Sequence, residues 1–256
     1  MSQAPAMPMR TEHLAQLDAI DQTYWWHRVR WRVVRWCLNR FTKRREFARY
    51  FDIGSGGGGL PGLLAKDFAF GEVVLFDQHA SDTRKCGQLN VTQQVIDLEA
   101  FDWSGVPAPD LITCLDVLEH LDEPQHLLQC VRARCGGRQS WLVVTVPAMA
   151  SLWSGWDVAA GHRRRYSRAG LQRLLSDAGW SVAYCGYFFR AAVLPLWLKR
   201  RVRSQQERAE LLFPELTPWT NALAERVCWW EFLMTKRLPM PFGSSLVAVA
   251  HAASGS

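Results

Sequence analysis

The chain has 256 residues, of which 48% are hydrophobic and 21% are charged. This composition provides enough apolar material for a buried core and excludes a disordered chain. The apolar runs are far shorter than the roughly twenty residues of a membrane-spanning helix, the first ten residues contain no signal-peptide-like run, and the seven cysteines form no CxxC pair. We therefore expect a cytoplasmic protein with reduced thiols, no transmembrane helix and no metal site.

The N-terminal part is basic and aromatic. Apolar residues recur at helical spacing, which predicts a helix over residues 11–49, and we expect residues 1–49 to form a lid over the rest of the chain. The net charge of +6 is concentrated here, because nine residues between positions 28 and 49 are Lys or Arg. Such a patch can attract phosphate groups, but it is more often a solvated face.

From residue 50 onward, short β-rich runs alternate with helical stretches. The expected strands are residues 50–53, 73–76, 95–96, 111–115 and 141–146. The expected helices are residues 60–68, 124–134 and 167–178, the last of which begins at a Ser167 cap. This alternation predicts parallel βαβ units in an α/β fold, with ligands bound at the carboxyl ends of the strands. We expect residues 186–256 to add helical pieces and a last strand, at 244–250, that completes the sheet.

A glycine-rich loop follows the first expected strand. Asp52 is followed by glycines at positions 54 and 56 to 59, and a helix is expected to begin after them. Glycines let the backbone approach a ligand closely, and a helix start offers free N–H groups. The spacing also satisfies the GxGxxG fingerprint of dinucleotide-binding proteins, and Asp77, 25 residues after Asp52, can hold a ribose in either kind of site. The loop alone therefore predicts a nucleotide cofactor without identifying it.

The motif Asp-Val-Leu-Glu-His-Leu, at residues 116–121, directly follows the fourth expected strand. Further characteristic segments are residues 109–112, the Gly-Gly pair at 136–137 with the strand 143–147 behind it, and residues 171–180. With these features the chain resembles class I S-adenosylmethionine-dependent methyltransferases, in particular the subgroup with DVLEHL after the fourth strand. The resemblance covers residues 50–185. It implies a Rossmann-like methyltransferase fold, a mostly parallel seven-stranded sheet with helices on both faces, and S-adenosyl-L-methionine as the cofactor.

The resemblance also implies individual cofactor contacts. The glycine loop after Asp52 would surround the methionine part of the cofactor, and Asp77 would hold the ribose. Asp97 would lie beside the adenine, and Asp116 would face the methionine or sulfonium group, where a carboxylate suits the positive charge. The chain departs from the family at Ser55, where a cysteine or threonine is common. The residues expected to bind the cofactor are Asp52, Gly54, Ser55, Gly56, Gly58, Asp77, Gln78, Asp97, Leu98, Asp116 and Val117.

The segment 147–166, after the fifth expected strand, resembles the part of this subgroup that lies over the active-site mouth. Methyl transfer needs an aligned acceptor and sometimes a base, and His162 is the expected base because the unperturbed pKa of a histidine side chain lies near neutrality. His162, Asp157 and Tyr166 could equally form a buried polar network that holds this loop. The expected catalytic residues are His162, Tyr166 and His120. The expected acceptor-binding residues are Tyr24, Trp25, Trp26, Trp153, Trp156 and Asp157.

The chain is thus predicted to be an S-adenosylmethionine-dependent methyltransferase that modifies an O, N or C atom of a small, apolar or lipid-like metabolite. An NAD(P)-dependent oxidoreductase is the first alternative, although it leaves the DVLEHL motif unexplained. The second is a nucleic-acid-binding module built on the Trp and Arg residues at 25–36, for which no recognition motif is visible. We expect no nucleic-acid partner and a monomer or homodimer. The aromatic and basic segment 187–201 could line an acceptor tunnel, form a dimer contact or rest on an anionic membrane.

Overall fold

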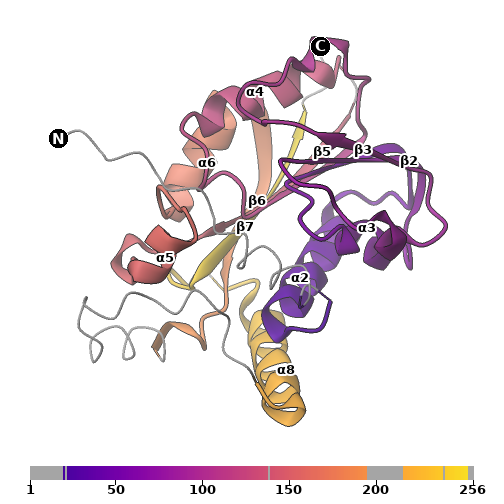
Figure 1. Cartoon of the computed structure of the whole chain (residues 1–256). Helices are drawn as coiled ribbons and strands as arrows, with labels where there is room; N and C mark the ends of the chain where they lie inside the picture. The colour runs from indigo at the N-terminus through magenta and orange to yellow at the C-terminus, as the bar shows by residue number, and fades with distance from the viewer. Residues whose placement is uncertain (1–19, 21, 138, 195–215, 239, 253–256) are drawn as a thin grey trace.

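The centre of the fold is a seven-stranded sheet with the strand order β3-β2-β1-β4-β5-β7-β6 (Figure 1). The computed structural model describes residues 20, 22–137, 139–194, 216–238 and 240–252. The strands are β1 (Glu46–Ile53), β2 (Ala69–Asp77), β3 (Val91–Val95), β4 (Leu111–Leu115), β5 (Trp141–Pro147), β6 (Trp180–Phe188) and β7 (Ser245–Ala252). Strands β1 to β5 pair in parallel, whereas β7 is antiparallel to both β5 and β6. The predicted α/β fold with a seven-stranded sheet is confirmed, and the sheet is mixed, with both antiparallel pairings made by β7.

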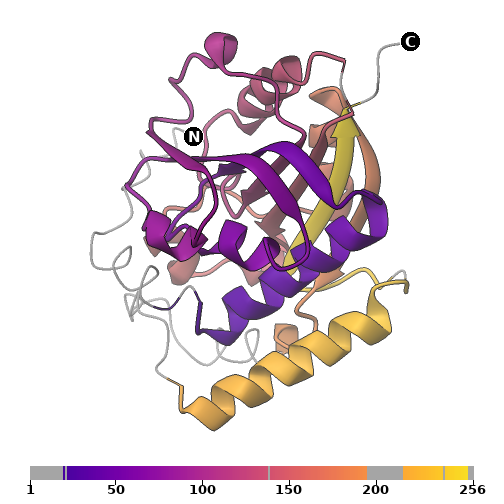
Figure 2. The same cartoon turned by 90° about the vertical axis from the view of Figure 1, so that its right-hand side faces the viewer.

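Helices cover both faces of this sheet. The longer ones are α2 (Trp25–Phe41), α3 (Gly59–Leu64), α4 (Pro124–Arg134), α6 (Arg168–Asp177) and α8 (Pro218–Thr235). The shorter ones are α5 (Gly155–Ala159) and the single turns Thr83–Cys86, Trp103–Gly105 and Ala150–Leu152. Apolar residues of α4 and α6 pack with one face of the sheet, and those of α2, α3 and α8 pack with the other. Helix α8 lies alongside α2, which places it outside the sheet's own helical layer (Figure 2).

Helix α2 shows why the predicted N-terminal helix is too long. Its buried residues Val29, Val33 and Cys37 follow helical spacing, so the face that packs on the sheet was visible in the sequence. The helix ends at Phe41, and Lys43 adopts a positive φ of 53° in the turn that follows. Residues 46–49, which were expected to be helical, instead begin β1 and pair with β2. The prediction of a helix to residue 49 was therefore wrong, because strand pairing extends β1 beyond its apolar run.

The other elements agree with the sequence where the hydrophobic signal was strong. Strand β4 and helix α4 have the predicted bounds, and α6 begins after Ser167, whose Oγ accepts a hydrogen bond from Gly170 N at 3.0 Å. Strand β3 was misplaced, because this edge strand consists largely of polar residues that give no apolar run. The helix expected to extend to residue 68 ends at Leu64, and the chain then turns directly into β2.

Part of the basic patch near the N-terminus is paired with acids within the fold. Ion pairs join it to acidic residues of other elements: Arg28 and Arg32 to Glu225, Arg35 to Asp67, and Arg49 to Glu72. These arginines fasten α2 and β1 to their neighbours, which favours a structural role for the patch over nucleic-acid binding. All seven cysteines are free thiols. Among the helices in the described part of the chain, none is long and apolar enough to cross a membrane.

Candidate active site

The glycine loop lies where three parallel strands end together. Ile53, the last residue of β1, stands beside Phe76 of β2 and Cys114 of β4. The loop is held there because Gly54 N and Ser55 N donate hydrogen bonds to the Phe76 carbonyl, at 2.7 and 3.3 Å. Gly54 has a φ of +70°, and a Cβ at this position would collide with the side chain of Val117. Position 54 therefore requires glycine for two independent reasons.

Asp77 and Asp97 follow neighbouring strands, as the family resemblance implied. The Asp77 carboxylate accepts hydrogen bonds from Gly56 N at 2.8 Å and His79 N at 2.9 Å, which ties it to the glycine loop. The Asp77 carbonyl accepts a hydrogen bond from Ile96 N at 2.8 Å, so Asp97 comes next to it at the end of β3. Asp97 and Gln78 are exposed, whereas Leu98 is buried in the core. The structure thus brings the expected ribose and adenine residues to one edge.

Asp52 has a different environment, because its carboxyl group is inside the protein. It is 3% exposed, and its Oδ1 accepts a hydrogen bond from Thr113 Oγ1 at 2.6 Å. Burial raises the pKa of Asp52 to about 7, against the opposing effects of the Thr113 hydrogen bond and the positive charge of Arg30. The group can therefore change its charge near neutral pH.

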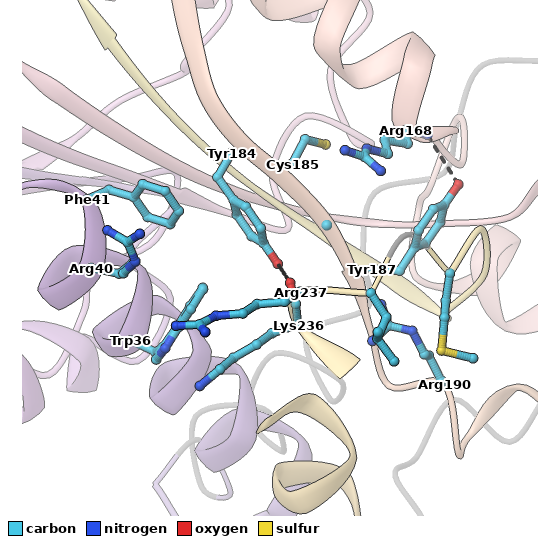
Figure 3. A pocket seen from close by; sticks show the side chains of 13 residues that line it. Trp36, Arg40, Phe41, Arg168, Tyr184, Cys185, Tyr187, Arg190, Lys236 and Arg237 are labelled. Atoms are coloured by element: carbon cyan, nitrogen blue, oxygen red, sulfur yellow. Dashed lines mark hydrogen bonds between the residues drawn. The ribbon is translucent and has the colours of Figure 1, made fainter. Parts of the chain in front are cut away.

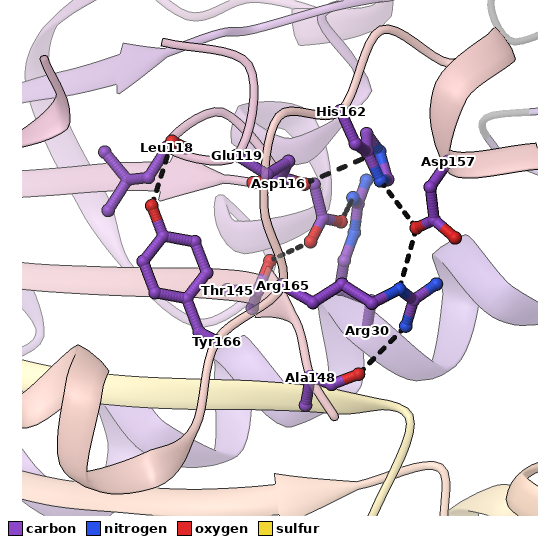
Figure 4. A network of polar contacts seen from close by, with 10 residues as sticks. All are labelled: Arg30, Asp116, Leu118, Glu119, Thr145, Ala148, Asp157, His162, Arg165 and Tyr166. Atoms are coloured by element: carbon purple, nitrogen blue, oxygen red, sulfur yellow. Dashed lines mark hydrogen bonds and ion pairs between the residues drawn. The ribbon is translucent and has the colours of Figure 1, made fainter. Parts of the chain in front are cut away.

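Asp116 is paired with an arginine that the sequence did not single out. Asp116 has a φ of +55° directly after β4, and its Oδ1 accepts a hydrogen bond from Thr145 Oγ1 at 3.2 Å. Its Oδ2 forms an ion pair with Arg30 of α2 (Figure 4). The Arg30 guanidinium also lies 4.6 Å from the Trp26 ring centroid. Strained backbone in a non-glycine residue is common at functional sites. Arg30 was hidden among the many arginines of α2, and no sequence spacing links it to Asp116.

His162 belongs to a buried polar network beside this ion pair (Figure 4). Its Nδ1 lies 3.0 Å from Asp157 Oδ1, which also accepts a hydrogen bond from Arg165 Nε at 2.7 Å. The other oxygen of Asp157 accepts hydrogen bonds from the backbone N and the Oγ of Ser154. Burial opposes ionisation of Asp157, but the hydrogen bond from His162 and the charge of Arg165 outweigh it and lower the pKa. An ionised Asp157 thus fixes the orientation of the imidazole.

The loop that carries His162 is tied to the 116–121 turn by backbone carbonyls. Arg163 Nε donates to the His120 carbonyl at 2.7 Å, and the buried Tyr166 hydroxyl donates to the Leu118 carbonyl at 3.0 Å. Arg163 N donates to the Glu119 carbonyl at 2.7 Å. His120 faces His162 with ring centroids 4.9 Å apart. The three expected catalytic residues are thus brought together, with the Tyr166 hydroxyl already engaged in a structural hydrogen bond.

The expected acceptor-binding residues fall into two groups. Trp25 and Trp26 pack against Phe189, with centroid separations of 5.4 and 6.2 Å, and Tyr24 adjoins Trp25. Trp156 lies 5.4 Å from the His162 ring, whereas Trp153 is 40% exposed. Asp157, the remaining member, is fully buried, and its oxygens are occupied by the contacts described above. Two of these six expected residues therefore contact the polar network: Trp26 contacts Arg30, and Trp156 contacts His162.

A cavity of about 370 Å³ lies elsewhere, between α2, β6 and the residues that follow α8 (Figure 3). Its basic lining residues are Arg40, Arg168, Arg190, Lys236 and Arg237. Arg190 is held by Glu231 at 3.3 Å and by Thr235 Oγ1 at 2.7 Å. None of the residues expected to bind the cofactor lines this cavity. It is therefore separate from the strand-end site.

A family model described as a methyltransferase domain matches residues 25–184, which is more than half of the chain. The chain belongs to the methyltransferase domain family. Membership in this methyltransferase family confirms the predicted enzyme class and its cofactor, S-adenosyl-L-methionine, and gives no support to a dinucleotide-dependent oxidoreductase. The matched residues include α2, so the arginine that pairs with Asp116 lies inside the methyltransferase domain. A search of curated proteins finds no match to the sequence.

Solved structures share the fold of this methyltransferase. A chain from the complex that contains the Haloferax volcanii Trm112 methyltransferase activator is 16% identical, with a TM-score of 0.59 and 96% of each chain covered. The [4+2]-cyclase SpnF is 16% identical, with a TM-score of 0.58 and full coverage of both chains. The Burkholderia thailandensis 1,6-didemethyltoxoflavin-N1-methyltransferase is 14% identical, with a TM-score of 0.55 and 98% of this chain and 93% of that chain covered. At these identities the likeness establishes the fold alone.

Proposed function

We propose that this methyltransferase transfers the methyl group of S-adenosyl-L-methionine to an O, N or C atom of a small, apolar or lipid-like acceptor, and that it belongs to the DVLEHL subgroup. The observation that carries the proposal is the contiguous arrangement of the Arg30–Asp116 ion pair, the glycine loop and the oriented His162. The Burkholderia thailandensis structure contains 1,6-didemethyltoxoflavin together with S-adenosylhomocysteine, which supports a small-molecule acceptor. Trp26 and Trp156 would supply apolar contacts to such an acceptor.

The Arg30–Asp116 pair suits the methionine part of the cofactor. The α-carboxylate of methionine is a partner for the guanidinium of Arg30, and the α-ammonium or the sulfonium is a partner for the Asp116 carboxylate. We infer that the cofactor inserts between these two side chains. Asp77 would hold the ribose and Asp97 the adenine, with the backbone of the glycine loop between them.

His162 would serve as the general base for an acceptor that must lose a proton. Its Nδ1 is oriented by the ionised Asp157, which leaves Nε2 to accept a proton. A lone pair of the acceptor then attacks the methyl carbon, and the C–S bond breaks with its electrons going to sulfur, so that S-adenosylhomocysteine leaves. Tyr166 would position the turn through Leu118, and His120 would support the imidazole of His162. Asp157 would act through His162 rather than on the acceptor itself.

Binding and kinetic measurements on the full chain test this function. Calorimetry should detect S-adenosylmethionine binding, and NADH should show none. In a methyl-transfer screen over small acceptors, His162→Ala should lower kcat at least about a hundredfold, because positioned proton transfer contributes about 10²–10⁴-fold to rate. Cofactor affinity should change little in this variant. Preference for NADH would overturn the methyltransferase proposal, whereas unchanged turnover would remove only His162 as the base.

We also infer that the chain makes a peripheral contact with an anionic membrane through α8. The outward face of this helix is apolar, as a contact with a membrane that contains a lipid-like acceptor requires. The segment 187–201, for which the sequence suggested such a contact, is described only as far as residue 194. A cytoplasmic location, a monomer or homodimer, the absence of a nucleic-acid partner and the division into lid, core and C-terminal segment stay predictions.

A further inference from the structure

Three side chains with metal-binding atoms meet beside the proposed acceptor site. One oxygen of Glu119, one imidazole nitrogen of His120 and one of His162 all lie within 4.8 Å of one another. Glu119 and His120 come from the turn after β4, and His162 comes from the loop after α5. Atoms bound to one small divalent ion stand about 3.3 Å apart, so modest side-chain rotations would bring this set to coordination distance. No ligand spacing links these residues in the sequence, because His162 comes 42 positions after His120.

Glu119 is the unusual member of this set. Its side chain is fully buried, and neither carboxylate oxygen has a hydrogen-bonding partner among the other described residues. His162 Nε2 lies 4.0 Å from Glu119 Oε1, which is beyond hydrogen-bond distance. A buried carboxylate without a partner is costly, and proteins normally satisfy it with a donor or a cation. Burial, and next the negative charge of Asp116, raise the pKa of Glu119 well above its usual value.

Asp157 orients His162 as a ligand. Asp157 accepts the Nδ1–H of His162, which directs the lone pair of Nε2 toward Glu119. A carboxylate behind a ligating imidazole is the usual support for a metal-bound histidine.

We propose that Glu119, His120 and His162 bind a divalent transition-metal ion of the zinc, cobalt or iron type. Two imidazoles and one carboxylate are ligands that suit these ions, and three protein ligands leave coordination positions open. The inference rests on the proposed function, because an open position here would take an acceptor oxygen. With the ion bound, His162 would be a ligand, and the general-base role proposed above would apply to the metal-free chain.

The chemistry of the transfer changes accordingly. The ion would lower the pKa of an acceptor hydroxyl bound to it, so that the hydroxyl could lose its proton to water near neutral pH. The acceptor oxygen would then donate an electron pair to the methyl carbon, and the electrons of the C–S bond would pass to sulfur. The products are the methylated oxygen and S-adenosylhomocysteine. This arrangement favours acceptors that present a hydroxyl group over those that present carbon.

Metal binding can be measured without any acceptor. The full chain is freed of metal with a chelator and titrated with Co²⁺, whose visible absorption reports imidazole and carboxylate ligation, and with Zn²⁺ by calorimetry. We expect one ion per chain and at least about tenfold weaker binding in Glu119→Gln and in His162→Gln, because removing one ligand of a three-ligand site costs well over 1.4 kcal/mol. The affinity for S-adenosylhomocysteine, measured in parallel, should be retained and shows that each variant is folded.

His126→Gln is the matched control, because His126 is an exposed histidine with Cys130 Sγ 3.5 Å from its Nε2. This variant should bind metal like the wild-type chain. No binding to the wild-type chain would overturn the metal site, as would binding that survives both Glu119→Gln and His162→Gln or that is lost in His126→Gln. A wild-type chain that binds metal but no S-adenosylhomocysteine would instead count against the proposed function.

Discussion

Asp52 is a buried acid whose charged form the fold disfavours. Its pKa is raised by burial to about 7, so between about pH 4 and pH 7 the folded chain holds a proton that the unfolded chain has released. The stabilisation that comes from this bound proton is complete below the pKa of Asp52 in the unfolded chain, and it is lost as the pH rises through the folded-state pKa of about 7. The loss is at most about 4 kcal/mol, since one pKa unit corresponds to about 1.4 kcal/mol.

The variant Asp52→Asn isolates this effect from other titrating groups. The asparagine carbonyl can still accept the hydrogen bond from Thr113 Oγ1, but it carries no charge at any pH. Urea unfolding of both proteins at pH 5 and pH 8 gives the difference in their unfolding free energies. We expect this difference to move in favour of Asp52→Asn by about 1–3 kcal/mol between the two pH values. An unchanged difference would show that Asp52 is ionised throughout.

Individual residues of the candidate site were predictable only where they follow an expected strand or the glycine loop in the sequence. Asp77 follows the end of β2 in a regular pattern, and the structure joins it to the glycine loop. Arg30 and Glu119 could not be assigned in this way. Arg30 contacts Asp116, which lies 86 positions further along the chain. Glu119 is a charged residue of the 116–121 motif, but the fold buries it completely. Side-chain direction and burial, which decide both cases, are tertiary properties.

Helix α2 combines a structural face with a functional one. Val29, Val33 and Cys37 face the core, while Arg30 turns toward Asp116. If Arg30 binds the methionine carboxylate, Arg30→Met should weaken S-adenosylhomocysteine binding about tenfold or more, because a charge-assisted hydrogen bond contributes about 1.5–3 kcal/mol. Methionine keeps the apolar stem against Trp26. Calorimetry of the variant and the wild-type chain measures the change.

Adenosine binding is a control that distinguishes loss of the Arg30 contact from general damage to the cofactor site. It lacks the methionine part, so its affinity should be the same in Arg30→Met and the wild-type chain. Arg35→Met is the control on the same helix, since Arg35 pairs with Asp67 and not with a site residue. Equal losses for adenosine and S-adenosylhomocysteine would contradict the assigned role of Arg30.

Whole elements were predictable when their own residues carried the signal. Strand β4 is buried along its entire length, and α6 begins at a serine cap, so both were correctly placed. Strand β3 carries Thr92, Gln93 and Gln94 and is defined by pairing to β2, which the local sequence does not encode. The end of α2 was likewise decided by strand pairing rather than by helix propensity. Errors therefore concentrate where tertiary contacts outweigh local preference.

Helix α8 exposes a stripe of apolar side chains on the outer surface of the molecule. Along α8, apolar side chains are exposed at helical spacing: Trp219 67%, Leu223 50%, Val227 45%, Trp230 63% and Met234 71%. The acids of this helix point away from the stripe, because Glu225 pairs with Arg28 and Arg32, and Glu231 pairs with Arg190. The chain carries a net charge of +6. An exposed apolar stripe on a basic protein is complementary to an anionic lipid surface.

Vesicle sedimentation tests this contact directly. The wild-type chain should bind vesicles of phosphatidylglycerol, bind phosphatidylcholine vesicles weakly, and lose affinity as salt rises, because the charge component is screened. Trp219→Ser combined with Trp230→Ser should reduce binding by about tenfold or more, since each indole that enters the interface contributes on the order of 1 kcal/mol or more. Val95→Ser removes an apolar residue that is 57% exposed on strand β3 and should leave binding unchanged. If the tryptophan variant bound vesicles normally but changed from dimer to monomer in light scattering, the stripe would be a contact between two copies of the chain.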